Sequence, residues 1–264
     1  MTMTPAKAGP GASRGTRKFV AECGALAWRA ILKMWRTPEQ FADVLLQPIL
    51  FTAMFGYLLG GAVAGSVKDY LPTLVPGVLV MSALTASMAT GMQLREDMDF
   101  GVYERFRALP ISRVAPIAGP MLADLARYAI AGVITFGVGM AMGYRPDMAG
   151  AAASLALVVF AGWALAWPFA LLGAVARSTQ AVQALSMLLM LPLTFLSNAF
   201  VPVETLPRWL QVFVDINPVS HVVTGVRDLA HHGQVSSSVW WALAGGLAIV
   251  VITAPLVVRR AARR

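Results

Sequence analysis

The sequence predicts an all-α integral membrane protein. We expect six transmembrane helices, an N-terminal interfacial helix, a short helix in one cytoplasmic loop, and a short extracellular re-entrant or interfacial helix before the last span. Composition is the first reason: of 264 residues, 58% are apolar and 13% are charged, whereas soluble domains average about 45–50% and about 25%. The mean hydropathy is +0.67. The second reason is that several apolar runs reach the roughly 20 residues that a helix needs to cross the hydrocarbon core.

The N-terminal segment precedes the first apolar run. Residues 1–16 are rich in Thr, Pro, Ala and Gly, and we expect a disordered cytoplasmic tail. Residues 17–35 place apolar and charged side chains at helical spacing, which predicts an amphipathic helix at the cytoplasmic interface, with Trp28 and Trp35 at headgroup depth. Because the first long apolar run begins only near Phe41, no secretory signal peptide is expected.

Six runs are long enough to cross a membrane. Several contain proline, which predicts kinks that neighbouring helices can accommodate. The pairs Gly56/Gly60 and Gly139/Gly143 allow close helix approach, either within one chain or at a dimer face. The expected spans are residues 42–64, 72–94, 118–142, 150–174, 181–201 and 239–258.

Positive charge is distributed unevenly along the chain. Most of the 21 Lys and Arg residues lie in the N-terminal segment, in the loop after the second span, or at the C-terminus. The positive-inside rule therefore places both termini and that loop in the cytoplasm. The formal charge of +8 could suggest nucleic-acid binding, but basic residues between and beyond apolar runs are typical of a topology signal. No nucleic-acid partner is expected.

The loop at residues 95–116 is polar and lies between two apolar runs. Val102, Phe106 and Leu109 fall at i, i+4 and i+7, so they share one face of a short helix with charged residues around it. A glycine precedes this helix and a proline ends it. A helix with an apolar stripe in a cytoplasmic loop suits contact with another protein. The alternative is a solvated loop that lies on the lipid headgroups.

The outer segment, residues 202–238, separates the last two spans. Trp209 and Phe213 belong to an apolar pattern at helical spacing, and the following Asn-Pro pair is expected to end that helix. About a dozen residues cannot span, so the helix should lie on the outer surface or enter as a re-entrant hairpin. Trp240 and Trp241 mark the outer interface where the last span begins.

Polar side chains inside the spans are candidate sites because charge is unfavourable there. Asp124 and Arg127 lie at i, i+3 near the cytoplasmic start of the third span. They form either a mutual ion pair or a polar anchor near the entrance of a pathway. Ser197 and Asn198 place hydrogen-bonding groups near the outer end of the fifth span, either in a pathway or between helices.

Two sets of large side chains could also contact a ligand. Trp163 and Trp167 are one turn apart in the fourth span, where a planar molecule could stack or another helix could pack. Met88 and Met92 form a flexible stripe with Met81 on the second span. Thioether side chains suit promiscuous pockets, and they also fill gaps in any core.

Motifs of several enzyme classes are absent from the sequence. The single cysteine, Cys23, excludes an internal disulfide and a cysteine metal cluster. The histidines lie in the outer segment and form no H-E-x-x-H motif, and Gly-Lys never occurs, so there is no P-loop. We therefore expect a protein that is not an enzyme and binds no metal or nucleotide cofactor itself.

Two stretches resemble a known family. The sequence E-R-F-R-A-L-P-I-S-R at residues 104–113 resembles the cytoplasmic coupling segment of type-2 ABC transporter permeases. The stretch L-S-N-A-F-V-P-V-E-T-L-P-R-W-L-Q at 196–211, followed by N-P-V-S-H at 217–221, is similar to the region between the last two spans of that family. D-M-D-F-G-V-Y-E-R-F-R-A-L-P is similar to the daunorubicin-resistance branch, whose members are drug-export permeases. The resemblance extends from about residue 19 to 260.

The resemblance implies a function and partners. Residues 17–264 would form the permease domain of an ATP-driven exporter that moves a hydrophobic drug or secondary metabolite out across the cytoplasmic membrane. Two copies would form a homodimer, and two ABC ATPase subunits, which bind ATP and Mg, would dock on the cytoplasmic face. The short cytoplasmic helix would be the coupling helix, with transmission residues Val102, Glu104, Arg105, Phe106, Arg107 and Leu109.

Three other functions fit parts of the sequence. Export of a lipid or lipid-linked glycan would use the same machinery, but the spans show no aromatic track for sugars. An intramembrane enzyme would need clustered carboxylates or histidines inside the spans, which are absent. A secondary transporter with inverted repeats would show similar halves, and only the second half carries the long outer segment.

Overall fold

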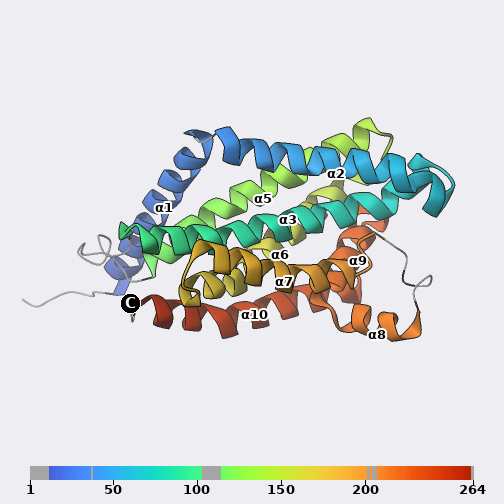
Figure 1. Cartoon of the computed structure of the whole chain (residues 1–264). Helices are drawn as coiled ribbons and strands as arrows, with labels where there is room; N and C mark the ends of the chain where they lie inside the picture. The colour runs from blue at the N-terminus through green and yellow to red at the C-terminus, as the bar shows by residue number, and fades with distance from the viewer. Residues whose placement is uncertain (1–11, 37, 103–113, 201–202, 204–206, 263–264) are drawn as a thin grey trace, which may run out of the picture.

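A computed structural model describes residues 12–36, 38–102, 114–200, 203 and 207–262. This part of the chain is helical and contains no strand, and most of the helices lie side by side along one direction (Figure 1). The helices are α1 (Ala12–Arg36), α2 (Pro38–Ala64), α3 (Val67–Asp99), α5 (Ala115–Ala141), α6 (Met148–Val175), α7 (Thr179–Phe195), α8 (Arg208–Ile216), α9 (Pro218–His232) and α10 (Ser237–Ala262).

Five of these helices, α2, α3, α5, α6 and α10, are long and apolar enough to cross a membrane. They correspond to five of the six predicted spans. The run predicted to span at 181–201 forms α7, which has 17 residues and a length of about 25 Å. It ends at Phe195, where side chains instead of the backbone N–H groups of a further turn donate hydrogen bonds to carbonyl oxygens of the last turn. Ser197 Oγ donates to Thr194 O, and Asn217 Nδ2 donates to Leu193 O.

Helix α1 packs against α5 and, more weakly, α2. It begins at Ala12, inside the stretch that was expected to be a disordered tail. Cys23 and Met34 are buried against the bundle, whereas Trp28 is 63% exposed. The helix therefore has one buried face, and its position at the membrane interface stays a prediction. The next helix starts at Pro38, where a proline costs no hydrogen bond because a first-turn N–H has no intrahelical partner.

Helix α3 is the centre of the bundle and contacts α2, α5, α6, α7 and α9. Figure 1 shows α2 and α5 on one side of it and α6, α7 and α10 on the other. The crossing of α3 and α6 depends on two glycines. A Cβ on Gly91 would overlap the carbonyl group of Phe169, and a Cβ on Gly173 would overlap the carbonyl oxygen of Gly91. These helices can therefore lie in backbone contact only because both residues lack a side chain.

The glycine pairs noted in the sequence pack within the chain. Gly60 faces Val67, so the first two spans approach each other closely beside their connecting turn, where Gly65 adopts a φ of +77°. Gly139 faces the side chain of Val75 in the same way. Among the described residues these positions are filled by the chain's own side chains, so they support intramolecular packing rather than a dimer face.

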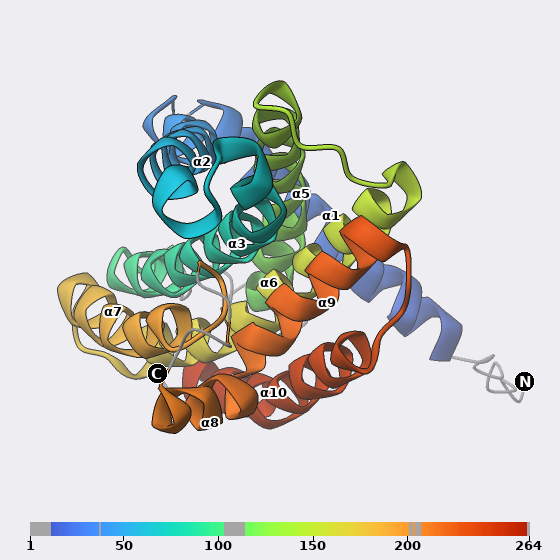
Figure 2. The same cartoon turned by 90° about the vertical axis from the view of Figure 1, so that its right-hand side faces the viewer.

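The outer segment forms two helices, not one. The Asn217-Pro218 pair ends α8, as predicted, but it also starts α9: Asn217 Oδ1 accepts a hydrogen bond from Val219 N at 2.9 Å, and Pro218 occupies the first helical position. Helix α8 is exposed and carries Trp209, whereas α9 is inserted against α3, α6 and α10 with Val226 fully buried. Figure 2 shows both helices from the end of the bundle where they lie. The sequence prediction of a single short helix missed α9.

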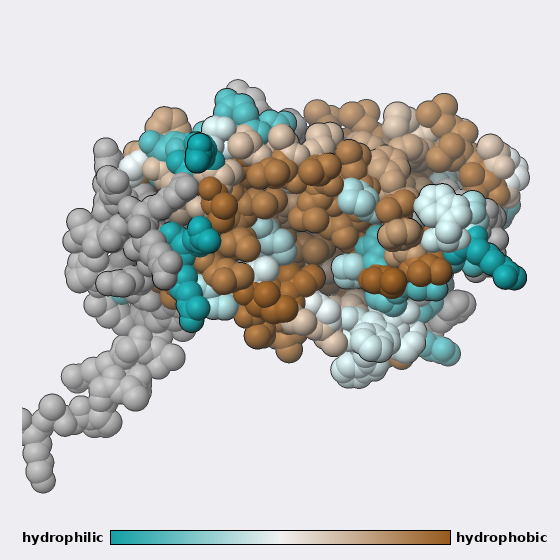
Figure 3. Space-filling view, turned by 60° about the horizontal axis from the view of Figure 1, so that its bottom comes forward, coloured by the Kyte–Doolittle hydropathy of each residue, from teal (hydrophilic) through white to brown (hydrophobic). Residues whose placement is uncertain are grey.

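One end of the bundle is held together by a buried apolar cluster. The end of α3, the start of α5 and the ends of α6 and α10 share one buried cluster that contains Leu94, Ile117, Ala174 and Ala261. The start of α1 lies at the same end (Figure 1). Figure 3 shows a wide apolar surface between more polar ends. Together with the five candidate spans, this arrangement makes the chain a multi-pass membrane protein.

Candidate functional site

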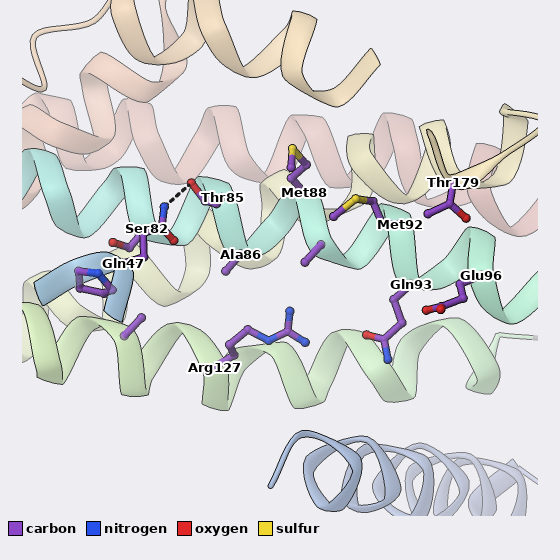
Figure 4. Close-up of a pocket in the computed structure, with 13 residues that line it drawn as sticks. Gln47, Ser82, Thr85, Ala86, Met88, Met92, Gln93, Glu96, Arg127 and Thr179 are labelled. Carbon is purple, nitrogen blue, oxygen red and sulfur yellow. Dashed lines mark hydrogen bonds between the residues drawn. The ribbon is translucent and has the colours of Figure 1, made fainter. Parts of the chain in front are cut away.

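A pocket of about 450 Å³ lies between α2, α3, α5 and α7, and we call it the methionine pocket (Figure 4). It extends along α3 from Ser82, near the middle of the helix, to Glu96, near its C-terminal end. The lining residues are Gln47, Pro48, Ser82, Thr85, Ala86, Met88, Ala89, Met92, Gln93, Glu96, Arg127, Ala131 and Thr179.

Helix α3 supplies most of this lining. Its polar positions Ser82, Thr85, Gln93 and Glu96 are separated by steps of three and four residues, or their multiples, so they share a face of the helix. Met88 and Met92 border the same face, as the sequence pattern suggested. The polar lining was not among the predicted site residues, although the sequence contains its signal: polar side chains at helical spacing inside an otherwise apolar span.

Hydrogen bonds fix parts of the pocket wall. Gln47 Nε2 donates to Thr85 Oγ1 at 3.1 Å and so joins α2 to α3. Figure 4 shows Gln93 and Arg127 projecting from α3 and α5 into the space between these helices. The pocket therefore combines flexible apolar side chains with a few hydrogen-bonding groups, which is the usual composition of a small-molecule site.

The predicted ion pair is formed beside the pocket. Arg127 Nη2 lies 2.8 Å from Asp124 Oδ1, and Thr90 Oγ1 donates to Asp124 Oδ2 at 2.6 Å. Asp124 is only 2% exposed, whereas Arg127 also lines the pocket. The charges of Arg127 and Asp124 compensate each other. The formal net charge of the pocket lining therefore comes from the carboxylate of Glu96.

A second polar junction lies at the C-terminal end of α3. Arg95 is buried, its Nη1 donates to the carbonyl oxygen of Ala176 at 3.0 Å, and its Nε donates to Asp99 Oδ1 at 3.0 Å. Ala176 ends α6, and Ser178 caps the start of α7. Arg95 therefore ties the end of α3 to the turn from which α7 begins. This contact between residues 81 positions apart could not be read from local sequence.

Trp163 and Trp167 lie elsewhere. Their rings meet edge to face with centroids 6.1 Å apart, and both line a separate cavity of about 350 Å³ between α1, α5 and α6. The structure therefore does not bring the methionine stripe and the two tryptophans together in one pathway.

Ser197 and Asn198 lie just after α7, and Asn198 joins this segment to α9. Asn198 Nδ2 donates to Thr224 Oγ1 at 2.8 Å, and Asn198 O accepts from Arg227 Nη2 at 3.1 Å. Both bonds join the segment after α7 to α9. Ser197 Oγ instead bonds within its own segment, donating to Thr194 O and accepting from Ala199 N. Neither residue lines the methionine pocket.

One of the histidines takes part in a similar junction at the same end of the bundle. His231 Nε2 lies 3.3 Å from Tyr144 Oη and 3.3 Å from the carbonyl oxygen of Pro72, which joins α9 to the start of α3. Burial raises the pKa of Tyr144 to about 12, although the nearby Arg227 opposes this shift. The phenol is therefore neutral at physiological pH. Among the described residues, no group of three or more His, Cys, Asp or Glu side chains is arranged to hold a metal ion.

The predicted coupling residues are described only at their edge. Val102 is the last described residue before the gap, and it follows Gly101, whose φ of +64° is adopted readily only by glycine. Glu104, Arg105, Phe106, Arg107 and Leu109 lie outside the described residues.

Comparison with known proteins agrees with the resemblance seen in the sequence. A family model described as "ABC-2 type transporter" matches residues 21–230. The chain is 40% identical over 235 residues to the daunorubicin resistance ABC transporter permease protein DrrB1 of Streptomyces coeruleorubidus, and the match covers 88% of this chain and 83% of that protein.

More distant relatives are also named as permeases. The probable doxorubicin resistance ABC transporter permease protein DrrC of Mycobacterium tuberculosis is 26% identical over 248 residues, which cover 93% of this chain and 90% of that protein. The putative transport permease ycf38 of Porphyra purpurea is 27% identical over 220 residues, which cover 80% of this chain and 74% of that protein. The family match and these alignments cover nearly all of the helical bundle. The chain therefore belongs to the ABC-2 type transporter family of membrane permeases.

Proposed function

We propose that this chain is the permease subunit of an ATP-driven exporter and that the methionine pocket receives the transported molecule. The substrate would be a hydrophobic drug or secondary metabolite that leaves the cell across the cytoplasmic membrane. The observation that carries the proposal is a pocket of about 450 Å³ with mixed lining in a chain that is 40% identical to a permease named for daunorubicin resistance.

The lining suits a range of hydrophobic molecules. Met88 and Met92 have unbranched, polarisable side chains that adapt to differently shaped ligands. Gln47, Gln93 and Arg127 can offer hydrogen bonds at a few fixed points. Because the ion pair with Asp124 neutralises Arg127, a ligand would meet a hydrogen-bond donor there without a net positive charge.

Orientation follows from the distribution of charge. The N-terminal segment, the loop after α3 and the C-terminus carry most of the Lys and Arg residues. The start of α1, the end of α3 and the end of α10 lie at one end of the bundle (Figure 1). The positive-inside rule supports placing this end, and both termini, in the cytoplasm. Glu96 and Thr179 lie near that end, so the methionine pocket would take its ligand from the cytoplasmic side or the inner leaflet.

ATP hydrolysis would be supplied by ABC ATPase subunits, which bind ATP and Mg and dock on the cytoplasmic end. Movement of the ATPase subunits would displace the coupling residues around Val102 and Phe106. It would reach α3 directly, because α3 ends at Asp99, shortly before these residues. Helix α3 lines the pocket from Ser82 to Glu96. Arg95 would pass the same movement to the α6–α7 turn through its bond to Ala176.

Two copies of the chain would form the transport unit, with two ATPase subunits. Helices α2 and α7 flank the methionine pocket and expose large apolar side chains, among them Tyr57, Leu58 and Leu188. A second copy that packs on this face would close the side of the pocket. Cysteine pairs introduced at these positions should crosslink between copies in membranes.

Co-purification with an ATPase tests the proposal. A tagged permease is expressed with a candidate ABC ATPase from the same genome and extracted in mild detergent, and ATP hydrolysis is measured with and without daunorubicin. We expect a stoichiometric complex whose hydrolysis responds to the drug. Ala89→Trp, which fills the pocket, should still co-purify but lose the response. Gly137→Trp should keep it, because Gly137 has open space around its Cβ position and does not line the pocket.

Two results would contradict the proposal. If no ATPase is retained in several detergents, the chain does not work as the permease of such a complex. If Ala89→Trp responds to daunorubicin as the wild-type complex does, the methionine pocket is not the binding site.

A further inference from the structure

We propose that Glu96 makes the methionine pocket selective for amphiphilic cations. The positive group of the ligand would lie beside this carboxylate, and its apolar part would contact the two methionines of the lining. The inference rests on the proposed function, because it concerns the ligand of the same pocket. It goes further by naming the charge of the ligand and the residue that selects it.

Met88, Met92 and Glu96 form a row along α3. They are separated by steps of four residues, so they lie on one side of the helix, and all three line the pocket. The row covers about 12 Å along the helix axis. Figure 4 shows the three side chains following one another along α3. A ligand with an apolar body and a positive end, aligned with the helix, would match this order of two thioethers and a carboxylate.

Exposure changes along the row in the same order. Met88 and Met92 are half-buried, whereas Glu96 is exposed. The carboxylate therefore remains hydrated at the mouth of the pocket, where its charge is not penalised by burial. A cation beside Glu96 would also keep part of its water, while the rest of the ligand leaves water to contact the thioethers. Thioethers make favourable contacts with aromatic rings, so an aromatic body suits the deeper part of the pocket.

The charge of Glu96 is not compensated by another residue of the lining. Arg127 is the other charged residue there, and it pairs with Asp124 at 2.8 Å. Arg95, which precedes Glu96 on α3, instead donates to Asp99 and to the carbonyl oxygen of Ala176. Among the described residues, Glu96 forms no ion pair. Its carboxylate therefore attracts a cationic ligand, repels an anionic one and adds nothing for a neutral one.

Tetraphenylphosphonium and tetraphenylborate are suitable probes, because both carry four phenyl rings around a central atom but their charges are opposite. Binding of each radiolabelled ion to the purified permease in a non-ionic detergent is measured by scintillation proximity, which requires no ATPase. We expect the wild type to bind tetraphenylphosphonium. The affinity is then compared between variants, so that partition of the ions into the detergent, which is the same for every variant, cancels.

Glu96→Gln keeps the shape of the side chain and removes its charge. Its affinity for tetraphenylphosphonium should fall about two- to tenfold, as expected for one partly screened ion pair, and its affinity for tetraphenylborate should not fall. Glu96→Lys should favour tetraphenylborate. High salt should weaken tetraphenylphosphonium binding to the wild type more than binding to Glu96→Gln, because salt screens an exposed ion pair. Ala89→Trp, which fills the pocket, should abolish binding of both ions.

Asp97→Asn is the matched control. It removes the same charge from the next residue of α3, but Asp97 lines a narrow crevice between α3, α5 and α6 and not the methionine pocket. It should bind tetraphenylphosphonium like the wild type.

Three results would overturn the selectivity: no binding of tetraphenylphosphonium to the wild type, wild-type affinity in Glu96→Gln, or an equal loss in Asp97→Asn. The last result would assign the effect to the general charge of this end of α3. The proposed function is tested separately, by retention of the ATPase and by the response of its hydrolysis to daunorubicin. It can therefore stand when the selectivity fails, and a permease that retains no ATPase can still show the selectivity.

Discussion

Replacing Arg95 with methionine is expected to uncouple ATP hydrolysis from transport. Methionine keeps an unbranched stem of similar shape but has no donor, so the hydrogen bond from Arg95 to the carbonyl oxygen of Ala176 is lost. The end of α3 would then move without the turn between α6 and α7. Because α7 begins three residues after Ala176, it would no longer follow the movement that enters from the coupling segment.

The size of this effect follows from the burial of the two contacts. A hydrogen bond from a charged group contributes about 1.5–3 kcal/mol, and the Arg95 side chain is only 11% exposed. The ion pair with Asp99 contributes less than about 1 kcal/mol, because the Asp99 side chain is 40% exposed. Since about 1.4 kcal/mol corresponds to a factor of 10, loss of the Ala176 bond should weaken the link between α3 and the turn by about 10- to 150-fold.

The assay is the ratio of drug transported to ATP hydrolysed by the reconstituted complex. For Arg95→Met we expect hydrolysis within about twofold of wild type and a transport ratio at least tenfold lower. Asp99→Asn is the control, because it weakens the exposed pair but keeps the donor to Ala176. A wild-type ratio in Arg95→Met would refute the reasoning. An equal loss in Asp99→Asn would show that the ion pair, not the link to the turn, is responsible.

Three further predictions concern coupling, topology and packing. Phe106→Asp should abolish transport and weaken ATPase co-purification while the permease still reaches the membrane, because it places a charge on the apolar stripe of the predicted coupling helix. In intact cells, a membrane-impermeant maleimide should label Ser237→Cys but not Ser112→Cys. The native Cys23 should not be labelled, because its side chain is buried. Burial, and to a lesser extent the charge of the neighbouring Glu22, also raises the pKa of its thiol, which lowers the fraction of reactive thiolate. Gly91→Ala should lower the Tm of the purified permease by about 2–12 °C, because its methyl group would overlap a carbonyl of α6.

Each of these has a clear contrary result. Normal export by Phe106→Asp at normal expression would remove the coupling role of that segment. Labelling of Ser112→Cys in intact cells would reverse the orientation. An unchanged Tm for Gly91→Ala, with Gly137→Ala as the solvent- or lipid-facing control, would show that α3 and α6 can separate at no cost.

Most of the membrane-spanning helices were predictable, because a span is recognised from the length of an apolar run. Five candidate spans match apolar runs in the sequence, because about 20 apolar residues suffice to define a span. Helix α9 was missed because its start was interpreted only as a stop. The Asn217-Pro218 pair serves as a cap and first turn for the next helix, and the buried valines that follow are too few to suggest a span.

The site was predictable only in part, for a related reason. The ion pair of Asp124 and Arg127 is local, so spacing along one helix indicated it. Which aromatic or sulfur side chains share a cavity depends on how separate helices cross. That information resides in contacts such as Gly91 against α6, and local periodicity does not contain it. The bond from Arg95 to Ala176 is hidden from sequence patterns for the same reason.

ATP-dependent uptake of daunorubicin into inside-out membrane vesicles tests the central claim most directly. Vesicles contain the permease with its ATPase, the permease alone, or the complex carrying Phe106→Asp. We predict uptake only with the intact complex and ATP, and no effect of a proton ionophore. Uptake by the permease alone that a proton ionophore abolishes, without any need for ATP, would contradict the assignment and indicate a secondary transporter.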